Sequence, residues 1–319
     1  MNKKEEIKIL TSKNWLDYEI LDTGEGEKLE RVGKYKFVRP YEEAIWPKTL
    51  SKNDWRDVDS KFWSSKKGAK AGWVLNRKID KNWEISYQNI KFFVEPTPFR
   101  HFGFFPEQAS IWDFIDKKIS EQQLFNMAPQ ELALGSLKAR PFPAIKFLNL
   151  FGYTGLASLF ALRAGAEVTH LDASKQSLAW AKENQILSGL GNLPMRIIED
   201  DVIKFLEREI KRGNKYDCII MDPPKFGRGP KGEIWKIEEM LLRLLENVAK
   251  VLSDKPLFVI LTSYATDSSV LSLGYALSQT MKNFDGKVEV GELCLPEKSN
   301  NRLISLAHTA IWTPSLASD

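Results

Sequence analysis

Three acidic residues, Asp172, Asp201 and Asp222, each follow a short apolar run. Such runs are typical of buried parallel strands, and open sheets of parallel strands bind their ligands beyond the carboxyl ends of the strands. One acid there could accept the hydroxyls of a ribose, a second could accept from an adenine amino group, and a third could face the reacting end of the ligand. The pattern predicts a nucleoside cofactor. As an alternative, Asp201 or its neighbour Asp200 could cap the next helix.

A glycine-containing turn precedes the first of these acids. Gly152 and Gly155 follow the apolar run 147–150, and small residues there allow a ligand to approach the backbone. Thr154 is the predicted N-cap of a helix over Leu156–Arg163. The G-x-x-G spacing differs from the G-x-G-x-x-G of pyrophosphate-binding turns. We therefore expect a ligand with an adenosine and an amino acid but no phosphate, which is S-adenosylmethionine. The alternative is an ordinary strand–helix–strand unit with a chance acid.

The most specific short pattern is Asp222-Pro223-Pro224-Lys225. Its two prolines fix the backbone and cannot continue a strand, so the loop must turn out of the sheet. Such a loop could hold a planar substrate beside a methyl donor, and Lys225 and Arg228 could meet a phosphate. The glycine-rich run 227–232 could move as a lid or could be an ordinary surface loop.

The elements that position these residues alternate between strand and helix. Strands are predicted at 147–150, 168–171, 195–198, 216–221 and 257–262, and helices at 156–163, 176–187, 202–212 and 234–252. This alternation predicts an α/β fold with a doubly wound parallel sheet. Two final strands, 288–295 and 303–312, have no helix between them, so one of them must run antiparallel at the end of the sheet.

Residues 1–95 are expected to form a small β-rich domain before a catalytic domain over 96–319. Strands are predicted at 35–38, 83–87 and 90–94, with Gln88-Asn89 turning the last two into a hairpin. The domain contains six tryptophans: Trp15, Trp46, Trp55, Trp63, Trp73 and Trp83. They could stack RNA bases beside lysines, but we expect most of them to fill a core.

Composition is that of a water-soluble protein with a modest positive charge. The net charge is +4, and residues 61–91 hold eight basic residues against two acids, which indicates an anionic partner or a solvated face. No apolar run could cross a bilayer and no signal peptide is evident, so we expect a cytoplasmic protein without membrane contact. Two cysteines and three scattered histidines predict neither a disulfide framework nor a metal site.

Four segments, NLFGYTGLAS, LDAS, EDDV and MDPPKFGRGPKG, occur in an order and spacing that resemble the class I S-adenosylmethionine-dependent methyltransferases. The DPPKF form and the upstream GFFPEQ are most similar to the group that methylates large-subunit ribosomal RNA, which includes cytosine-5 and guanine-N7 enzymes. The resemblance extends from about Trp83 to Tyr264.

The resemblance implies a role for each segment. The methionine end of the cofactor would be lined by Asn149, Phe151, Gly152, Tyr153, Thr154 and Gly155. Asp172 would bind the ribose, Asp201 the adenine, and the residues from Asp222 to Lys225 the target base.

One departure concerns the methylated atom. Cytosine-5 members carry a nucleophilic cysteine just past the fifth strand, where this chain has Thr262-Ser-Tyr-Ala-Thr266, and Cys218 and Cys294 lie elsewhere. We therefore expect methylation of RNA, in particular large-subunit ribosomal RNA, at a base nitrogen or another heteroatom. The alternatives are a methyltransferase for a protein or small molecule, and a non-catalytic RNA-binding protein with this fold.

Overall fold

The computed structural model describes residues 6–12, 14–63, 71–126, 144–264 and 269–315. The chain forms two compact units. The first unit comprises Met1–Leu10, Ser110–Leu293 and Ala307–Asp319, and the second comprises Thr11–Ala109 and Cys294–Leu306. The division into domains at residues 95 and 96 stays a prediction.

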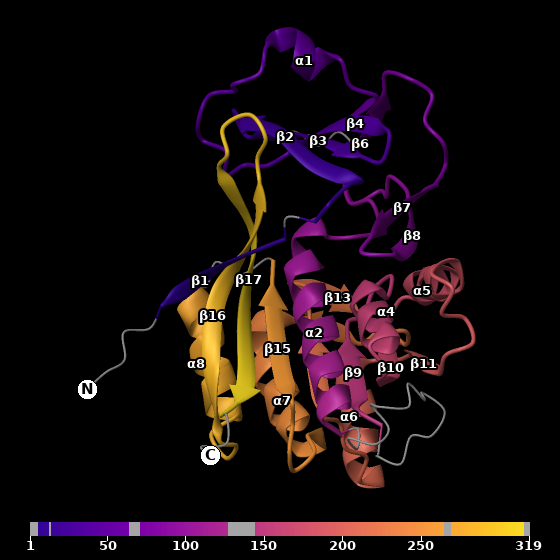
Figure 1. Ribbon diagram of the computed structural model, residues 1–319, viewed down its shortest axis with the longest axis vertical. Coiled ribbons are helices and arrows are strands. Elements are labelled where there is room, and N and C mark those ends of the chain that lie inside the picture. Colours follow the sequence, from indigo (N-terminus) through magenta and orange to yellow (C-terminus); the bar gives the residue numbers. More distant parts are fainter. Residues whose placement is uncertain (1–5, 13, 64–70, 127–143, 265–268, 316–319) are drawn as a thin grey trace. The chain divides into compact units, whose positions relative to one another are not determined.

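An eight-stranded sheet forms the centre of the first unit in the described part of the chain (Figure 1). Its strands are, in spatial order, β1 (Ile7–Thr11), β16 (Gly286–Pro296), β17 (Leu303–Pro314), β15 (Phe258–Ser263), β12 (Cys218–Met221), β9 (Lys146–Leu150), β10 (Glu167–Asp172) and β11 (Met195–Glu199). The strands from β15 to β11 are parallel, and β17 runs antiparallel to β15. The predicted doubly wound sheet with an antiparallel terminal strand is thus confirmed.

Helices cover both faces of this sheet, because its strands are apolar on both sides. The helices are α2 (Ala109–Asn126), α4 (Leu156–Arg163), α5 (Lys175–Leu187), α6 (Val202–Arg212), α7 (Ile237–Val251) and α8 (Val270–Thr280). Phe147 and Ile220 point to the face where α2 and α4 pack, whereas Leu148 and Ile219 point to the face of α6, α7 and α8. Each face thus has its own buried core.

Two local predictions are wrong. The N-cap position of α4 is occupied by Gly155, at a φ of 90°, and not by Thr154, because the turn enters the helix through a left-handed residue. The predicted helix 234–252 begins only at Ile237. The run before it is neither helix nor plain loop but a hairpin of β13 (Phe226–Arg228) and β14 (Ile234–Lys236).

The second unit is β-rich, as predicted. Its five-stranded sheet has the order β2 (Tyr18–Gly24), β3 (Glu27–Val32), β4 (Tyr35–Pro40), β5 (Ser60–Trp63) and β6 (Gly72–Leu75). The unit also contains α1 (Lys52–Arg56), the 3₁₀ turn η1 (Pro106–Gln108), and a hairpin of β7 (Trp83–Tyr87) and β8 (Ile90–Val94). The predicted turn residues Gln88 and Asn89 have φ values of 45° and 68°, as a two-residue hairpin turn with both central residues left-handed requires.

Aromatic side chains fill the core of this unit. Trp83 is 8% exposed and lies parallel to Phe37, with ring centroids 6.0 Å apart. Trp73 meets Phe37 edge to face at 5.6 Å, and the ring centroids of Trp15 and Tyr87 are 4.6 Å apart. The expected core role is confirmed for Trp83, whereas Trp15 and Trp73 are half-buried at the edge of this aromatic cluster. Trp63, in contrast, is 58% exposed.

The C-terminal hairpin loop belongs to the second unit through contacts with β2. Glu297 is 1% exposed, and its Oε1 accepts from both the backbone N–H and the hydroxyl of Thr23 at 2.6 Å. Arg302 Nη1 lies 3.1 Å from the other carboxylate oxygen. A buried carboxylate is stabilised by such charge-assisted bonds, so residues far apart in the sequence complete this unit. No helix among the described residues is long and apolar enough to cross a membrane.

Candidate active site

The predicted acids lie where neighbouring parallel strands end. Leu150 of β9 is the register partner of Leu171 in β10 and of Met221 in β12. Asp172 and Asp222 are the next residues along their chain segments, so they flank the start of the turn that follows β9. The structure therefore brings together the turn and two of the three acids that the sequence singled out.

The turn after β9 has a backbone conformation that residues other than glycine rarely adopt. Phe151 and Tyr153 have φ values of 61° and 50°. Positive φ at bulky residues costs energy and persists only where the surroundings impose it. Here the N–H of Gly152 donates to Leu171 O at 2.8 Å, and the N–H of Gly155 donates to Gly152 O at 3.0 Å.

The structure adds a packing reason for both glycines. A Cβ at Gly152 would lie 2.3 Å from His170 Cε1, and one at Gly155 would lie 2.9 Å from Ala181 Cβ. Both distances are shorter than real Cβ contacts allow. The glycines therefore let the turn lie directly on the side chains beneath it, in addition to leaving room for a ligand.

A buried polar network supports the turn from below. His170, which is fully buried, lies opposite Asn149 on the neighbouring strand. Asn149 Nδ2 donates to Ser158 Oγ at 3.0 Å, and Ser158 Oγ lies 2.9 Å from His170 Nδ1. His170 Nε2 lies 3.2 Å from the carbonyl oxygen of Tyr153. A side chain predicted to line the cofactor, that of Asn149, thus supports the turn, and its direct contact with a cofactor stays a prediction.

The protonation state of His170 follows from its surroundings. Burial lowers its pKa from 6.5 to about 4, so the ring is neutral at neutral pH. Since the carbonyl of Tyr153 can only accept, we assign the proton to Nε2, which leaves Nδ1 to accept from the Ser158 hydroxyl. A polar residue inside the apolar strand run VTHLD was the sequence signal for such a partner.

Thr154 is held by a second helix. It is 2% exposed, and its carbonyl oxygen accepts from Asn184 Nδ2, a fully buried amide of α5, at 3.0 Å. This side-chain bond to a backbone carbonyl orients the turn and does not involve the outward face of the turn. The sequence pattern of α5 did not mark Asn184 as a site residue.

The carboxylate of Asp172 fits the ribose role. Its Oδ2 accepts from the N–H of Tyr153 at 2.9 Å, and its Oδ1 accepts from the N–H of Ser174 at 2.8 Å. Burial raises the pKa of this carboxyl above its ordinary value. A carboxylate has about four acceptor positions, so capacity for a ribose hydroxyl remains beside these fixed bonds.

Asp201 caps a helix, as the alternative interpretation expected. It is the N-cap of α6, and its Oδ1 accepts from the N–H of Lys204 at 3.0 Å. Its neighbour Asp200 forms an ion pair with Arg208, and the N–H of Asp200 donates to Asp172 O at 3.2 Å. The end of β11 is thereby tied to the end of β10, while the adenine role of Asp201 stays a prediction.

Trp235 joins the two loops of the site, and sequence reasoning missed it. The ring is 4% exposed, and its Nε1–H donates to Pro224 O at 2.7 Å. It also meets Phe151 edge to face, with ring centroids 4.9 Å apart. The N–H of Ile237 donates to Lys225 O at 3.1 Å. The hairpin that carries Trp235 thus fixes the Asp222–Lys225 loop against the turn after β9.

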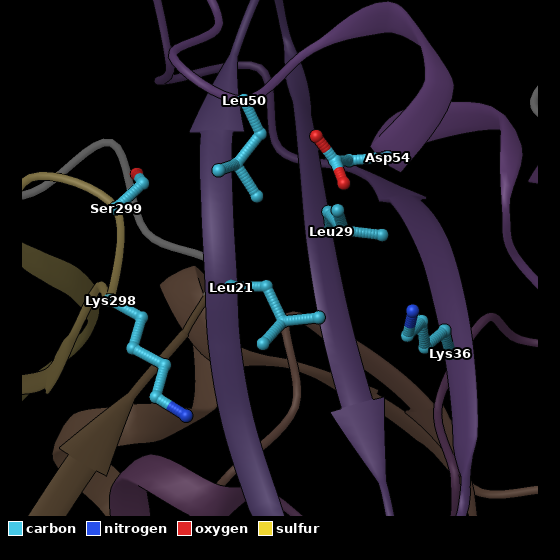
Figure 2. Close-up of a pocket in the computed structure, with 7 residues that line it drawn as sticks. All are labelled: Leu21, Leu29, Lys36, Leu50, Asp54, Lys298 and Ser299. Atoms are coloured by element: carbon cyan, nitrogen blue, oxygen red, sulfur yellow. The ribbon is translucent and has the colours of Figure 1, made fainter.

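The second unit contains a pocket of about 270 Å³ (Figure 2). It is lined by Leu21, Leu29, Lys36, Leu50, Asp54, Lys298 and Ser299. Lys36 Nζ lies 3.2 Å from Asp57 and Lys298 Nζ lies 2.7 Å from Glu19, so both lysines are balanced by carboxylates. None of the predicted site residues lines this pocket.

Two solved structures that are similar to this chain are named as methyltransferases. The S-adenosylmethionine-dependent methyltransferase from Agrobacterium tumefaciens is 36% identical, with a TM-score of 0.86 over 99% of this chain and 98% of that one. A putative methyltransferase complexed with S-adenosylhomocysteine is 17% identical, with a TM-score of 0.62 over 90% of this chain and 72% of that one, which shows the fold alone.

Curated relatives match a smaller part of the chain. The ribosomal RNA large subunit methyltransferase K of Neisseria meningitidis is 34% identical over 110 residues, 34% of this chain and 31% of that protein. The ribosomal RNA large subunit methyltransferase I of Aeromonas salmonicida is 42% identical over 84 residues, 26% of this chain and 21% of that protein. The chain therefore spans less than a third of the length of these relatives.

No family model matches the chain. The match to the Agrobacterium enzyme covers nearly the whole of both chains at 36% identity, with a TM-score of 0.86. The cofactor expected from the turn and from Asp172 is the one that this family uses. The chain belongs to the family of S-adenosylmethionine-dependent methyltransferases.

Proposed function

We propose that this enzyme methylates RNA, specifically large-subunit ribosomal RNA, at a base nitrogen or another heteroatom, with guanine N7 as the leading candidate. The observation that carries the substrate is that the curated relatives are named as ribosomal RNA large subunit methyltransferases. A cytoplasmic location accords with this substrate.

The residues of the chain would act mainly by position. The bound cofactor supplies a methyl group on a sulfonium leaving group. Asp172 would hold the ribose, and the turn Phe151–Gly155 would hold the methionine end. The loop Asp222–Lys225, fixed by Trp235, would place the target base in line with the methyl group. Proximity and orientation of this kind supply much of the rate in a bimolecular transfer.

The cysteines favour a heteroatom target. Carbon 5 of a pyrimidine is a poor nucleophile, and its methylation needs a thiolate that first adds to the neighbouring carbon. The sequence contains two cysteines, and Cys218 and Cys294 are 0% and 2% exposed. Burial raises the pKa of Cys218 well above its ordinary value, which suppresses the thiolate. Nitrogen and oxygen nucleophiles need no covalent step.

The test of the substrate is mass spectrometry of RNA nucleosides from cells with and without this protein. We expect one methylated nucleoside to disappear from large-subunit RNA in its absence and to return when the purified enzyme and cofactor are added. Transfer to a protein or small molecule, with RNA unchanged, would contradict the proposal.

The test of the atom uses RNA that carries 5-fluorocytidine. A cytosine-5 enzyme is trapped as a covalent adduct on this base, whereas a heteroatom enzyme leaves no protein–RNA species after denaturation. We expect no adduct. An adduct that disappears in Cys218→Ser or Cys294→Ser would show that the enzyme uses a thiolate.

A further inference from the structure

The hairpin of β13 and β14 has two different faces. Gly227 is paired with Trp235, and the Trp235 side chain is buried against the site loops. The flanking pairs, Phe226 with Lys236 and Arg228 with Ile234, alternate with that pair and therefore point the other way. We call these four residues the outer face of the hairpin.

The outer face exposes apolar side chains to water. Phe226 is 54% exposed and Ile234 is 57% exposed, and Arg228 and Lys236 are exposed beside them. The two strands of this hairpin have only three residues each, and these exposed apolar side chains are not part of a buried core. Neighbouring exposed apolar residues with a polar rim commonly mark a binding surface.

The charge of the hairpin is strongly positive. Residues 225–236 contain four basic residues, Lys225, Arg228, Lys231 and Lys236, and one acid, Glu233. Glu233 is engaged by Lys204 from α6 at 2.5 Å, so it does not offset the hairpin cations fully. Lys236 Nζ lies 2.7 Å from Glu239 on α7, which places one helix carboxylate at the edge of the face. The net charge favours an anionic partner.

The outer face is fixed to the catalytic loop through its reverse side. The Nε1–H of Trp235 donates to Pro224 O, and a Cβ at Gly227 would lie in van der Waals contact with Pro224 Cγ at 3.4 Å. The face therefore begins one residue after Lys225, the last residue of the loop that would hold the target base. When the target base of a substrate reaches this loop, the neighbouring part of the substrate must lie near the hairpin.

We propose that the outer face binds the RNA nucleotides that flank the target, with a base stacked on Phe226 and a phosphate beside Arg228. An aromatic ring beside a cation matches a strand that presents flat bases and charged phosphates at regular spacing. Stacking is independent of base identity, so this contact would add affinity, while the pocket of the target base would set specificity. The inference rests on the proposed RNA substrate.

The experiment compares full-length variants in methyl transfer to large-subunit RNA from cells that lack the protein. Phe226→Ala should raise KM for this RNA at least about fivefold, whereas Phe226→Tyr, which keeps the ring, should stay close to wild type. Arg228→Ala should flatten the salt dependence of RNA affinity by about 0.7 in slope. Matched controls are Leu242→Ala, an apolar residue 69% exposed on α7, and Lys211→Ala at the end of α6.

The outcomes separate this inference from the proposed function. All variants should bind S-adenosylmethionine as wild type does in calorimetry, because none changes the cofactor loop. If wild type methylates RNA but Phe226→Ala keeps its KM, the outer face is not an RNA contact and the substrate proposal stands. If wild type transfers to a protein, and Phe226→Ala impairs that transfer, both proposals fail. A KM that rises equally in Leu242→Ala would also overturn the inference.

Discussion

Asp172 tests the cofactor site most directly, because its carboxylate is both fixed by the backbone and placed at the end of β10. Two charge-assisted bonds to ribose hydroxyls are worth about 1.5–3 kcal/mol each. Asp172→Ala should therefore weaken S-adenosylmethionine binding at least about tenfold, as measured by calorimetry. Glu199→Ala, an exposed acid at the end of the neighbouring strand, is the control. Unchanged affinity in Asp172→Ala would remove this residue from the site.

His170 makes the stability of the parallel sheet depend on pH. Its pKa is about 4 in the folded protein against an ordinary value of 6.5, so between these values the opened chain binds a proton that the folded chain does not. The free energy of opening therefore falls as the pH drops from 6.5 towards 4, by at most about 1.4 kcal/mol per pH unit. Above pH 6.5 this residue contributes no pH dependence.

Hydrogen exchange of peptides that cover β9 and β10, corrected for intrinsic rates, measures this opening locally. His170→Gln keeps a donor for the carbonyl of Tyr153 but cannot titrate, so it should lower stability at pH 7 and lose this part of the pH slope. A slope between pH 6.5 and 5 that is the same in wild type and variant would assign the titration to other groups.

At the scale of elements, the β13–β14 hairpin couples the two loops of the site. Trp235→Phe removes the bond from Nε1 to Pro224 O but retains a ring against Phe151. Loss of one buried hydrogen bond costs about 1–3 kcal/mol. Since that bond orients the substrate loop, we expect kcat/KM for RNA to fall roughly five- to tenfold and the cofactor Kd to change less than twofold. Trp63→Phe, at an exposed ring, should change neither value. A fall in cofactor affinity as large as that in kcat/KM would place Trp235 in the cofactor site.

The sequence predicted the elements whose residues carry their own periodic pattern. The five parallel strands are short, mostly apolar runs, and α5 and α6 have clear starts and stops, so their positions agreed with the prediction to within a few residues. The Gln88-Asn89 hairpin was predicted because both turn residues tolerate positive φ. The acids at strand ends were found by the same reasoning.

Elements that depend on distant partners could not be predicted. The three-residue strands β13 and β14 are stabilised by Trp235 packing under Pro224, a contact that leaves no local pattern. β1 (Ile7–Thr11) is an edge strand beside β16 (Gly286–Pro296), at the other end of the sequence. The Thr154 cap was predicted from residue type, yet the turn over His170 requires the left-handed conformation that Gly155 supplies.

At the scale of the whole molecule, fewer cations of the basic run 61–91 are available to bind RNA phosphates than the composition indicated. Lys61 Nζ lies 2.6 Å from Glu27, and Lys91 Nζ lies 2.7 Å from Glu84. Arg77 forms an ion pair with Asp57. Cations balanced in this way release few counterions on binding RNA. Lys66, Lys67 and Lys70 lie outside the described residues, and Lys78 and Lys81 are exposed, so the predicted RNA contact now depends on these five lysines.

Salt dependence separates these two groups of cations. Each phosphate contact on single-stranded RNA contributes about −0.7 to the slope of log affinity against log salt. If the second unit binds RNA through Lys66, Lys67 and Lys70, replacing these three lysines with Ala should flatten the slope by up to about 2. Replacing Lys61, Arg77 and Lys91, the same number of charges in the same run, should leave it nearly unchanged because their carboxylate partners already neutralise them. Both triple variants lose three positive charges, so a general effect of net charge would change both slopes equally. Equal slopes in both variants and wild type would show that these six cations form a solvated face, and the salt dependence of RNA affinity would then have to come from other parts of the chain.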